Sequence, residues 1–384
     1  MLHQNSVFHS LLKLVPWHRL ERSVEKHGAD ELSRELTTKR HFIALMYAQF
    51  SGAMSLREIV TGMASHETRL YHLGAAPVKR STLSDANRDR PWQVFGELFS
   101  ALLDQAHRGL RRAAGEAVRL IDSTSVRLSS LSGDWATFST DVYGAKAHII
   151  YDPNADRPVY FAVTPANVND ITAAKVMPIE AGATYVYDLG YYDYRWWAEL
   201  DEHGCRFVTR LKKNTPFTVL RENRVRNNSN IVSDRIGHLP ARLAASRKNP
   251  LQVPVREIRV VIETGKMLRI VTNDLDAPAQ EIADLYKQRW QIELFFRWVK
   301  QTLRIKRFIG VSENAVRIQI AIALIAFLLL RLAQATQKVV RSPLEFARLV
   351  RINLMYRRPI DRLLEPLQPV DINPNQLKLG LYFP

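Results

Sequence analysis

The chain is poor in cysteine and has no long apolar run, and each absence excludes a class of protein. Cys205 is the single cysteine among 384 residues, so an internal disulfide or a cysteine-rich zinc site is excluded. The longest uncharged, mostly apolar run, Ile318 to Leu330, has 13 residues, whereas a membrane span needs about 20. We expect it to form a buried helix. Histidine and lysine interrupt the apolar residues of the N-terminus, which does not have the pattern of a signal peptide.

Acidic residues are outnumbered by basic ones. The chain has 38 Asp and Glu against 54 Lys and Arg, which leaves a formal net charge of +16. A soluble chain with this excess most often binds polyanions, and nucleic acid is the leading case. Hydrophobic residues make up 46% of the chain, which is enough for real cores and excludes disorder throughout. A chain of 384 residues predicts two or three domains.

Residues 1–110 have the periodicity of helices. Ser55 followed by Glu58 forms a capping box, and a second helix start at Ser81 is ended by Pro91. We predict an all-helical N-terminal domain in which residues 55–90 form a helix-turn-helix-like pair, with a plain helical bundle as the alternative. In the first interpretation Ser84, Asn87 and Arg88 read bases, and Lys79, Arg80 and Arg90 contact phosphates.

From Ala117 onward strand patterns alternate with helix patterns. We expect helices after Asp170 and around Trp196, and strands at residues 118–126, 146–152, 158–164, 183–187 and 206–211. Such an alternation is typical of a mixed α/β sheet.

Residues 212–269 interrupt that alternation. A turn at Thr264 and Gly265 joins two strand patterns into a hairpin, which predicts an inserted β-rich unit. This segment has 13 Lys and Arg against 4 Asp and Glu, a surplus that supplies over half of the net charge. A solvated basic face and a phosphate-contacting surface both fit this composition.

Two aspartates end predicted strands. Asp122 follows the apolar residues Leu120 and Ile121, and Asp188 follows the run from Tyr185 to Tyr187. A carboxylate at the polar end of a strand can be held rigidly at a sheet edge. Each aspartate alone is more often a turn former or a helix cap than a metal ligand.

A third carboxylate lies on a helix. Residues 285–305 read as one continuous amphipathic helix, with Leu294 among the apolar residues of its opposite side. At about 100° per residue, one narrow face of this helix carries Tyr286, Arg289, Glu293, Arg297 and Lys300. Surface ion pairs between Glu293 and its neighbouring arginines are the alternative interpretation of this stripe.

Together these residues resemble the DDE transposases of bacterial insertion sequences, in the group named for insertion sequence four. The spacing Tyr286-x2-Arg289-x3-Glu293-x6-Lys300 is similar to the signature of that group. The sequences IDST around Asp122 and DLGYY around position 188 are similar to its first and second acidic motifs. The likeness extends from about residue 120 to residue 330, and the N-terminal 110 residues resemble the helical domain that precedes such cores.

The resemblance implies an α/β fold whose core is a ribonuclease-H-like mixed sheet at residues 111–336. The core would contain the β-rich insertion at about 212–269, follow the helical DNA-binding domain at 1–110 and precede a helical tail at 337–384. It also implies that Asp122, Asp188 and Glu293 are catalytic and hold two Mg²⁺ ions, which Mn²⁺ can replace, with Asp122 bridging both.

By the same resemblance, Arg289 and Lys300 clamp phosphates near the cleavage point and Tyr286 contacts the same DNA end. Arg297 is added from its place on the helix face. Relatives that form a DNA hairpin use a Trp in the insertion, and residues 212–269 contain none, so we assign no hairpin route.

The implied function is metal-dependent transposition. The enzyme would cut at the terminal inverted repeats of an insertion sequence and join the 3′-hydroxyl ends to target DNA, as a homodimer on paired ends in a bacterial cytoplasm, on the chromosome and without membrane contact. Two alternatives stay open, a nuclease or resolvase that cuts without joining and a non-catalytic DNA-binding protein derived from a transposase.

Other polar residues near the motifs are expected to be structural. Asp170 precedes a helix, and His148 lies on a strand as a half-buried histidine. Asp193 is expected to cap the next helix and is the best reserve candidate for a catalytic acid.

Overall fold

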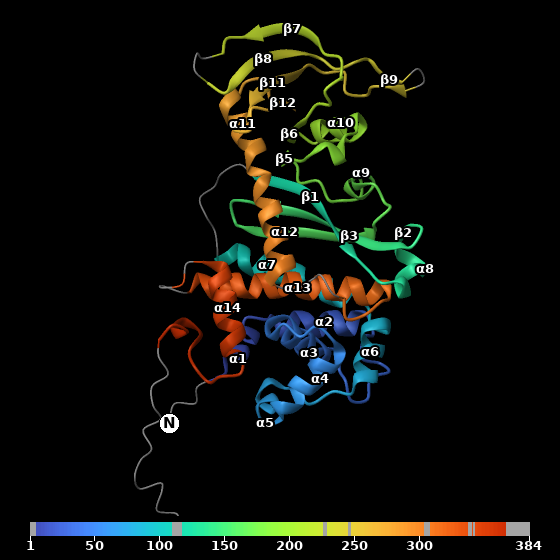
Figure 1. Ribbon diagram of the computed structural model, residues 1–384, viewed down its shortest axis with the longest axis vertical. Coiled ribbons are helices and arrows are strands. Elements are labelled where there is room, and N and C mark those ends of the chain that lie inside the picture. The colour runs from blue at the N-terminus through green and yellow to red at the C-terminus, as the bar shows by residue number, and fades with distance from the viewer. Residues whose placement is uncertain are drawn as a thin grey trace, which may run out of the picture.

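The computed structural model describes residues 5–109, 117–225, 229–244, 247–302, 308–336, 340 and 342–365. The molecule is elongated, with a sheet extending from its middle to one end and a helical layer at the other (Figure 1). Before the sheet, the chain forms α1 (Val7–Leu12), α2 (Trp17–Lys26), α3 (Thr38–Ser51), α4 (Leu56–Ser65), α5 (Glu67–Leu70), α6 (Arg80–Asp89) and α7 (Gln93–Gly109). This confirms the expected helical N-terminal region.

The first part of the sheet contains β1 (Val118–Arg127), β2 (Thr137–Ser139), β3 (Val142–Asp152), β4 (Arg157–Pro165), β5 (Thr184–Val186) and β6 (Arg206–Arg210). Strand β3 lies between β4 and β1 and is antiparallel to both, whereas β5 and then β6 continue the sheet parallel to β1. Three antiparallel strands followed by two parallel ones are the ribonuclease-H-like arrangement, which confirms the expected fold class.

The strands of the insertion continue this same sheet. They are β7 (Thr218–Asn223), β8 (Ile231–His238), β11 (Val255–Val261) and β12 (Met267–Thr272), and the short β9 (Arg242–Ala244) and β10 (Arg247–Lys248) pair apart from them. The expected hairpin is present as β11 and β12. Strand β12 pairs with β6, with Ile270 opposite Arg210. The β-rich insertion therefore lengthens the core sheet to ten strands.

Alternating side chains give the sheet two apolar faces. Ile121, Tyr185 and Phe207 pack on one face with residues of α9 (Asp170–Ala174) and α10 (Tyr194–Glu202). Leu120 and Val186 pack on the other face with α12 (Trp290–Thr302) and α13 (Glu313–Ala335). The remaining helices after the first strands are α8 (Gly133–Ala136), α11 (Ala279–Gln288) and α14 (Pro343–Asn353).

Helix α13 lies between the sheet and the N-terminal helices (Figure 1). It packs against α3, α6, α7 and α14, and every residue from Ile318 to Leu330 is buried. The helix is long and apolar enough to cross a membrane by length and composition, but 83% of its most apolar window is buried inside the fold. The prediction of a buried helix is confirmed, and burial on all sides explains why the run is apolar all round.

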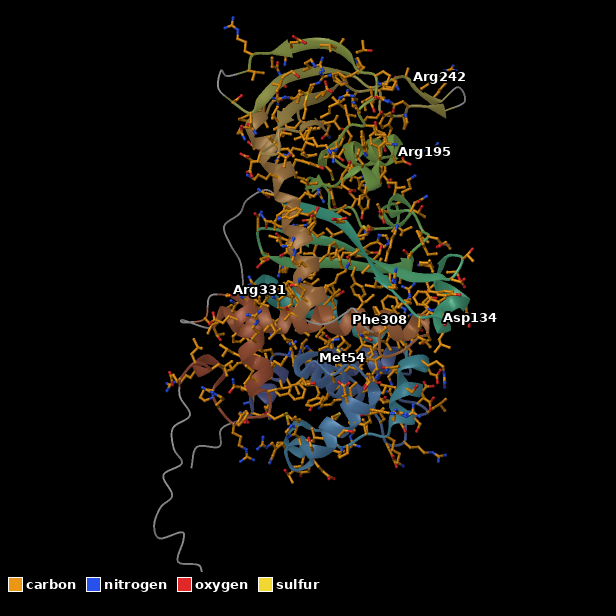
Figure 2. All side chains as sticks on the ribbon, viewed as in Figure 1. Met54, Asp134, Arg195, Arg242, Phe308 and Arg331 are labelled. Carbon is orange, nitrogen blue, oxygen red and sulfur yellow. The ribbon has the colours of Figure 1, made fainter. Side chains whose placement is uncertain are left out.

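Both ends of the described chain join this helical layer. The backbone N–H of Phe8 donates to the carbonyl of Leu354 at 2.9 Å, and helix α14 packs on α3. At the sheet side, Arg331 of α13 pairs with Asp156 in the turn between β3 and β4 at 2.6 Å, and Figure 2 shows Arg331 at this level of the molecule. Residues from both ends of the described chain therefore build one layer beneath the sheet.

We predict that Ile325→Ala lowers the free energy of unfolding by about 2–5 kcal/mol, because Ile325 in α13 has no solvent exposure and truncation leaves a cavity. Ile352→Ala is the matched control, since its side chain is 71% exposed on α14, and a change of less than about 0.5 kcal/mol is expected. Urea unfolding of the full chain measures both. Equal effects of the two substitutions would contradict the central position of α13.

Candidate active site

Asp122 and Asp188 lie side by side just beyond the point where the parallel pairing of β1 with β5 ends. The expectation that Asp122 ends its strand is wrong, because β1 continues to Arg127 through its pairing with β3. Strands β1 and β5 are parallel neighbours with Leu120 opposite Val186, and Asp122 and Asp188 each follow two residues later. A two-residue step returns a side chain to the same face of a sheet, so both carboxylates lie on the face that α12 covers. Asp122 accepts a hydrogen bond from the backbone N–H of Ser123 at 2.7 Å.

Asp188 stands just beyond β5 and caps a short turn of helix. Its side chain accepts from the backbone N–H of Gly190 at 2.8 Å. This bond holds the carboxylate at the sheet edge, as expected for an aspartate at the polar end of a strand.

Arg289 joins the helix carboxylate to the strand carboxylate. Its guanidinium donates to Glu293 at 2.6 Å and lies 3.4 Å from the Asp122 carboxylate. The side chains of Arg289, Asp122 and Glu293 are largely but not fully buried, with 18%, 18% and 31% exposed. Arg289 therefore bridges Asp122 and Glu293, which are 171 positions apart in sequence. With Asp188 beside Asp122, the three acidic residues expected to be catalytic gather around one site.

The electrostatics of Asp122 show how close the carboxylates are. The pKa of Asp122 is raised from 3.8 to about 7, chiefly by burial and also by the negative charges of Asp188 and Glu293. The Ser123 N–H and the Arg289 guanidinium act in the opposite direction. Asp122 therefore carries a proton part of the time near neutral pH when its neighbours are the only charges present.

The signature helix differs from the expected continuous one. The structure has two helices, α11 and α12, which meet at Arg289. The backbone N–H of Arg289 bonds to the carbonyl of Tyr286, three residues back, at 3.2 Å, so the helix tightens there. Leu294, expected on the apolar side, is 45% exposed. At about 80° from Tyr286 on a helical wheel it stands at the edge of the packed face, which explains the error.

The five residues expected on one stripe are divided by burial. Tyr286 is buried, Lys300 is half-buried, and the Arg289 guanidinium lies 5.9 Å from the centre of the Tyr286 ring. Arg297 is exposed and lies over the ring of Trp290 at 5.9 Å. Tyr286, Arg289 and Glu293 therefore form the inner part of the stripe, and Arg297 belongs to the surface.

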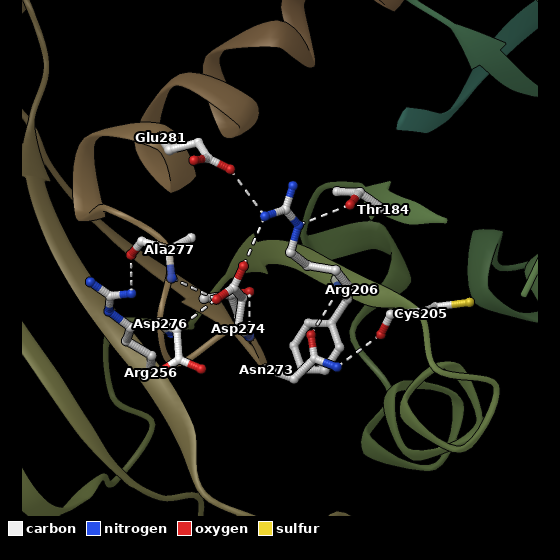
Figure 3. A network of polar contacts seen from close by, with 11 residues as sticks. Thr184, Cys205, Arg206, Arg256, Asn273, Asp274, Asp276, Ala277 and Glu281 are labelled. Carbon is white, nitrogen blue, oxygen red and sulfur yellow. Dashed lines mark hydrogen bonds and ion pairs between the residues drawn. The ribbon is translucent and has the colours of Figure 1, made fainter. Parts of the chain in front are cut away.

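A polar network fixes the start of α11 on the sheet (Figure 3). Arg206 of β6 donates to Thr184 at 2.9 Å, to Asp274 at 2.8 Å and to Glu281 of α11 at 3.1 Å. Asp274 in turn accepts from the backbone N–H of Ala277 at 2.8 Å. The network sets where α11 begins, and through it where Arg289 and Glu293 lie. Sequence reasoning missed Arg206, because its partner Glu281 is 75 residues away.

Two acids that the sequence assigned to structure have different surroundings. Asp193 caps α10 as expected, accepting from the backbone N–H groups of Arg195 and Trp196 at 2.9 and 3.0 Å. Asp170 does not cap its helix, because Asn169 holds the cap position. Its carboxylate instead accepts from the hydroxyl of Ser123 at 2.8 Å, one residue beyond Asp122. The only sequence signal for this was the polar residue after Asp122.

His148 is fully buried rather than half-buried, and its Nε2 lies 2.9 Å from the Thr164 hydroxyl. Burial lowers its pKa to about 4, so it is neutral at pH 7.

The residues expected to read DNA from α6 are in two environments. Lys79, Arg80 and Arg88 are exposed and Ser84 is half-buried. Asn87 is 4% exposed and bonds to His41 at 2.8 Å, and Arg90 is 7% exposed and bonds to the carbonyls of Leu36 and Ala29. The structure corrects the expectation for Asn87 and Arg90, because buried and bonded side chains pack the helix and do not reach bases or phosphates.

Arg88 is also engaged within the protein, since it pairs with Asp85 at 3.1 Å and with Asp89 at 2.8 Å. These acidic partners offset its charge. Lys79 lies 3.9 Å from Glu35 with both side chains mostly exposed, an arrangement that contributes little.

The basic residues of the insertion also fall into two sets. Arg235 and Arg269 pair with the fully buried Glu257, and Arg256 pairs with Asp234 at 2.7 Å. These arginines stabilise the added strands. The exposed set comprises Lys212, Lys213, Arg221, Arg224, Arg242, Lys248 and Lys266. A basic surface therefore remains after the internal pairs are removed.

A metal ion would find oxygen donors at this site, but not a closed set of ligands. Among the described residues, no three His, Cys, Asp or Glu side chains are grouped closely enough to hold one ion. Arg289 stands between Asp122 and Glu293 as their counter-ion. The donor chemistry nevertheless fits a hard divalent cation, because carboxylate oxygens are its preferred ligands and Asp188 and Glu293 raise the pKa of Asp122 by their proximity.

Comparison with known proteins identifies the family of the chain. The sequence pattern of the transposase DDE domain family matches residues 113–329 and so includes all three acidic residues. The chain belongs to the DDE transposase family. A domain family of unknown function (DUF4372) matches residues 3–76. A DDE transposase cuts and transfers DNA strands and depends on divalent metal, so the chain is a DNA-acting enzyme.

Relatives of this DDE transposase come from several bacteria. A protein of Sinorhizobium fredii described as the putative transposase y4zB is 41% identical over 74% of this chain and 80% of its own length. A probable transposase for the insertion sequence element IS5377 of Geobacillus stearothermophilus is 29% identical over 83% of this chain and 87% of its own. A solved synaptic complex of the piggyBac transposase with hairpin DNA covers 95% of this chain and 83% of its own at 10% identity, and its TM-score of 0.45 is too low to support an argument.

We predict that the Asp122 carboxyl of the metal-free protein titrates with a pKa of about 7 and that Arg289→Gln raises this pKa further, because the guanidinium favours the ionised form. Carbon-13 NMR of labelled aspartate measures this pKa, and Arg297→Gln on the exposed side of α12 is the control that leaves it unchanged.

The raised pKa of Asp122 also affects stability. Between about pH 4 and pH 7 the folded chain holds a proton on Asp122 that the unfolded chain, in which this pKa is 3.8, has released. The contribution of this group to stability therefore falls as pH rises from about 4 to about 7. An ordinary value near 3.8 would show that the site is open to water.

Proposed function

We propose that this enzyme catalyses two-metal phosphoryl transfer on DNA through Asp122, Asp188 and Glu293. The observation that carries the proposal is that Asp122 of β1 and Asp188 just beyond β5 follow paired residues of neighbouring strands, and that Arg289 joins Asp122 to the helix carboxylate Glu293. The proposed substrates are the terminal inverted repeats of an insertion sequence and a target duplex, in a bacterial cytoplasm and on the chromosome. A homodimer would hold paired ends.

The bound ions, Mg²⁺ or Mn²⁺, would supply activation of the attacking oxygen and neutralisation of the leaving oxygen. Asp122, Asp188 just beyond the adjacent strand and Glu293 on the covering helix would hold these ions. Water is the attacking group when a strand is cut, and the freed 3′-hydroxyl is the attacking group when it is joined. In both steps a P–O bond forms and the P–O bond to the leaving oxygen breaks.

Arg289 has a second role in this scheme. Without metal it neutralises Asp122 and Glu293, with atoms 3.4 and 2.6 Å away. Cations at the carboxylates would take over that role, and the guanidinium would then bind the phosphate of the DNA strand, for which its fork of donors is suited. Tyr286 packs against Arg289 and would hold it in place, and Lys300 would contact the backbone farther along the same helix.

The remaining DNA contacts are proposed for exposed cations. Lys79 and Arg80 at the start of α6, with Ser84 and Arg88, are the accessible part of the N-terminal region expected to bind DNA. Arg297 on α12 and the exposed basic set of the insertion lie on the surface as well. Arg297 and the exposed basic set of the insertion would add affinity that does not depend on the DNA sequence, because phosphate contacts carry no base information.

We predict that cleavage of a plasmid carrying the flanking inverted repeats falls by more than about 100-fold in each of Asp122→Asn, Asp188→Asn and Glu293→Gln. Loss of a residue that only orients a metal ligand typically costs less, about 10–100-fold. Binding to the same DNA is expected to persist, because the cations remain. Asp134→Asn is the matched control, an exposed carboxylate by α8 at the outer edge of the molecule (Figure 2). Retained cleavage in all three variants would refute the assignment.

The same assay separates the alternative functions. Cleavage without transfer of a labelled end into a target plasmid indicates a nuclease or resolvase. Specific binding without cleavage under Mg²⁺ or Mn²⁺ indicates a non-catalytic DNA-binding protein.

Lys300→Gln is predicted to weaken binding of the repeat-end duplex and to reduce the slope of log affinity against log salt by about 1, because one phosphate contact is lost. Lys287→Gln is the control on the adjoining helix α11, since Lys287 is 79% exposed and faces Glu263 at 3.7 Å. Fluorescence anisotropy over a salt series measures both. An unchanged slope for Lys300→Gln would exclude it from the DNA contact.

A further inference from the structure

Asp170 is a fourth carboxylate next to the proposed catalytic ones, on the opposite face of the sheet. It begins α9, and its Oδ1 accepts from the Ser123 hydroxyl at 2.8 Å. The same residue, Ser123, donates its backbone N–H to the Asp122 carboxylate at 2.7 Å. Ser123 therefore connects the two aspartates directly, with its main chain bound to one and its side chain to the other.

Asp170 also borders the turn that carries Asp188. A Cβ placed on Gly190 would stand 3.0 Å from Oδ2 of Asp170 and 3.0 Å from Oδ1 of Asp188. The two carboxylate oxygens therefore lie within about 6 Å of each other, with the glycine backbone between them. Glycine permits this approach because any other residue would force one carboxylate to move.

The charge of Asp170 has its own counter-ion. The ammonium group of Lys146 lies 3.1 Å from its Oδ1 and also donates to the carbonyl of Val168 at 2.9 Å. His148, 3.8 Å away, is neutral at pH 7 and contributes no compensating charge. Asp122 and Glu293, in contrast, share Arg289. Asp170 is thus already neutralised by a lysine on β3, while the other carboxylates depend on a cation that is also expected to bind DNA.

All three aspartates act on one buried phenol. Tyr191 has no solvent exposure, and burial and then the charges of Asp170, Asp122 and Asp188 raise its pKa. Tyr191 therefore lies near all three carboxylates.

We infer that Asp170 is a positioning residue of the active site, which holds the Asp122 segment of β1 through Ser123 and limits the Asp188 turn across Gly190. The inference rests on the proposed function, since it assigns Asp170 to the outer shell of the proposed metal site. Outer-shell partners orient the carboxylates that bind an ion, and their loss typically costs about 10–100-fold in metal affinity. Asp170 itself does not coordinate, because its Oδ1 is bound to Ser123 and Lys146.

The test is Mn²⁺ binding to the full chain without DNA, followed by electron paramagnetic resonance, for the wild type and five variants. Asp170→Asn and Ser123→Ala are each expected to weaken Mn²⁺ binding by about 10–100-fold. Their combination is expected to be little worse than either alone, because both act through one hydrogen bond. Asp134→Asn leaves binding unchanged, and Asp188→Asn abolishes it. For Ser123→Ala, binding of the repeat-end duplex and the melting temperature are expected to stay near wild type. A residue with a merely structural role would lose stability or DNA binding together with metal affinity.

Each other result overturns something specific. Wild-type Mn²⁺ affinity in both Asp170→Asn and Ser123→Ala overturns the inference alone. Loss in Asp170→Asn as complete as in Asp188→Asn makes Asp170 a ligand and also overturns the positioning role. If Asp170→Asn fails to fold, Ser123→Ala decides, because it removes only a hydroxyl. Unchanged Mn²⁺ binding in Asp188→Asn refutes the proposed metal site and with it this inference.

Discussion

The approach of Asp122 and Glu293 depends on the guanidinium of Arg289. Carboxylates on the covered face of a sheet repel each other, and burial makes their charges more costly, as the raised pKa of Asp122 shows. Arg289 offsets part of this cost by lying 2.6 Å from Glu293 and 3.4 Å from Asp122. The helix that carries it is fixed in turn by Arg206, Asp274 and Glu281 at the start of α11. The site is therefore assembled by ion pairs that connect the sheet with the signature helix.

The architecture supports this assembly from below. Helix α13 is buried between the sheet and the N-terminal helices, and the chain after it returns through α14 to meet α1 and α3. Helix α12 thus packs between β1 of the sheet and helices α13 and α14 of this layer. A closely packed layer on that side keeps Glu293 opposite the strand ends, because packed interiors leave little room for a helix to move.

The division of cations follows the same logic. Arginines of the insertion that pair with Glu257 and Asp234 stabilise the sheet, whereas the exposed set and Lys300 are the proposed DNA contacts. In the proposed scheme Arg289 serves both the carboxylates and the DNA phosphate, because it neutralises the carboxylates until metal ions do. Metal binding and phosphate binding would then be coupled through one side chain. On the opposite face of the sheet, the charge of Asp170 stays paired with that of Lys146.

Local pattern by itself determined the helical N-terminal region, the strands before Asp122 and Asp188, the hairpin of β11 and β12, and the family, because periodicity and motif spacing are written in consecutive residues. It did not reveal that the insertion lengthens the core sheet, that Asn87 and Arg90 are buried, or that the signature helix tightens at Arg289. Asp170, Ser123 and Lys146 likewise come together only in the fold, since strand pairing and helix packing unite residues 24 to 47 positions apart. Those contacts are set by long-range burial and charge compensation, which tertiary structure alone decides.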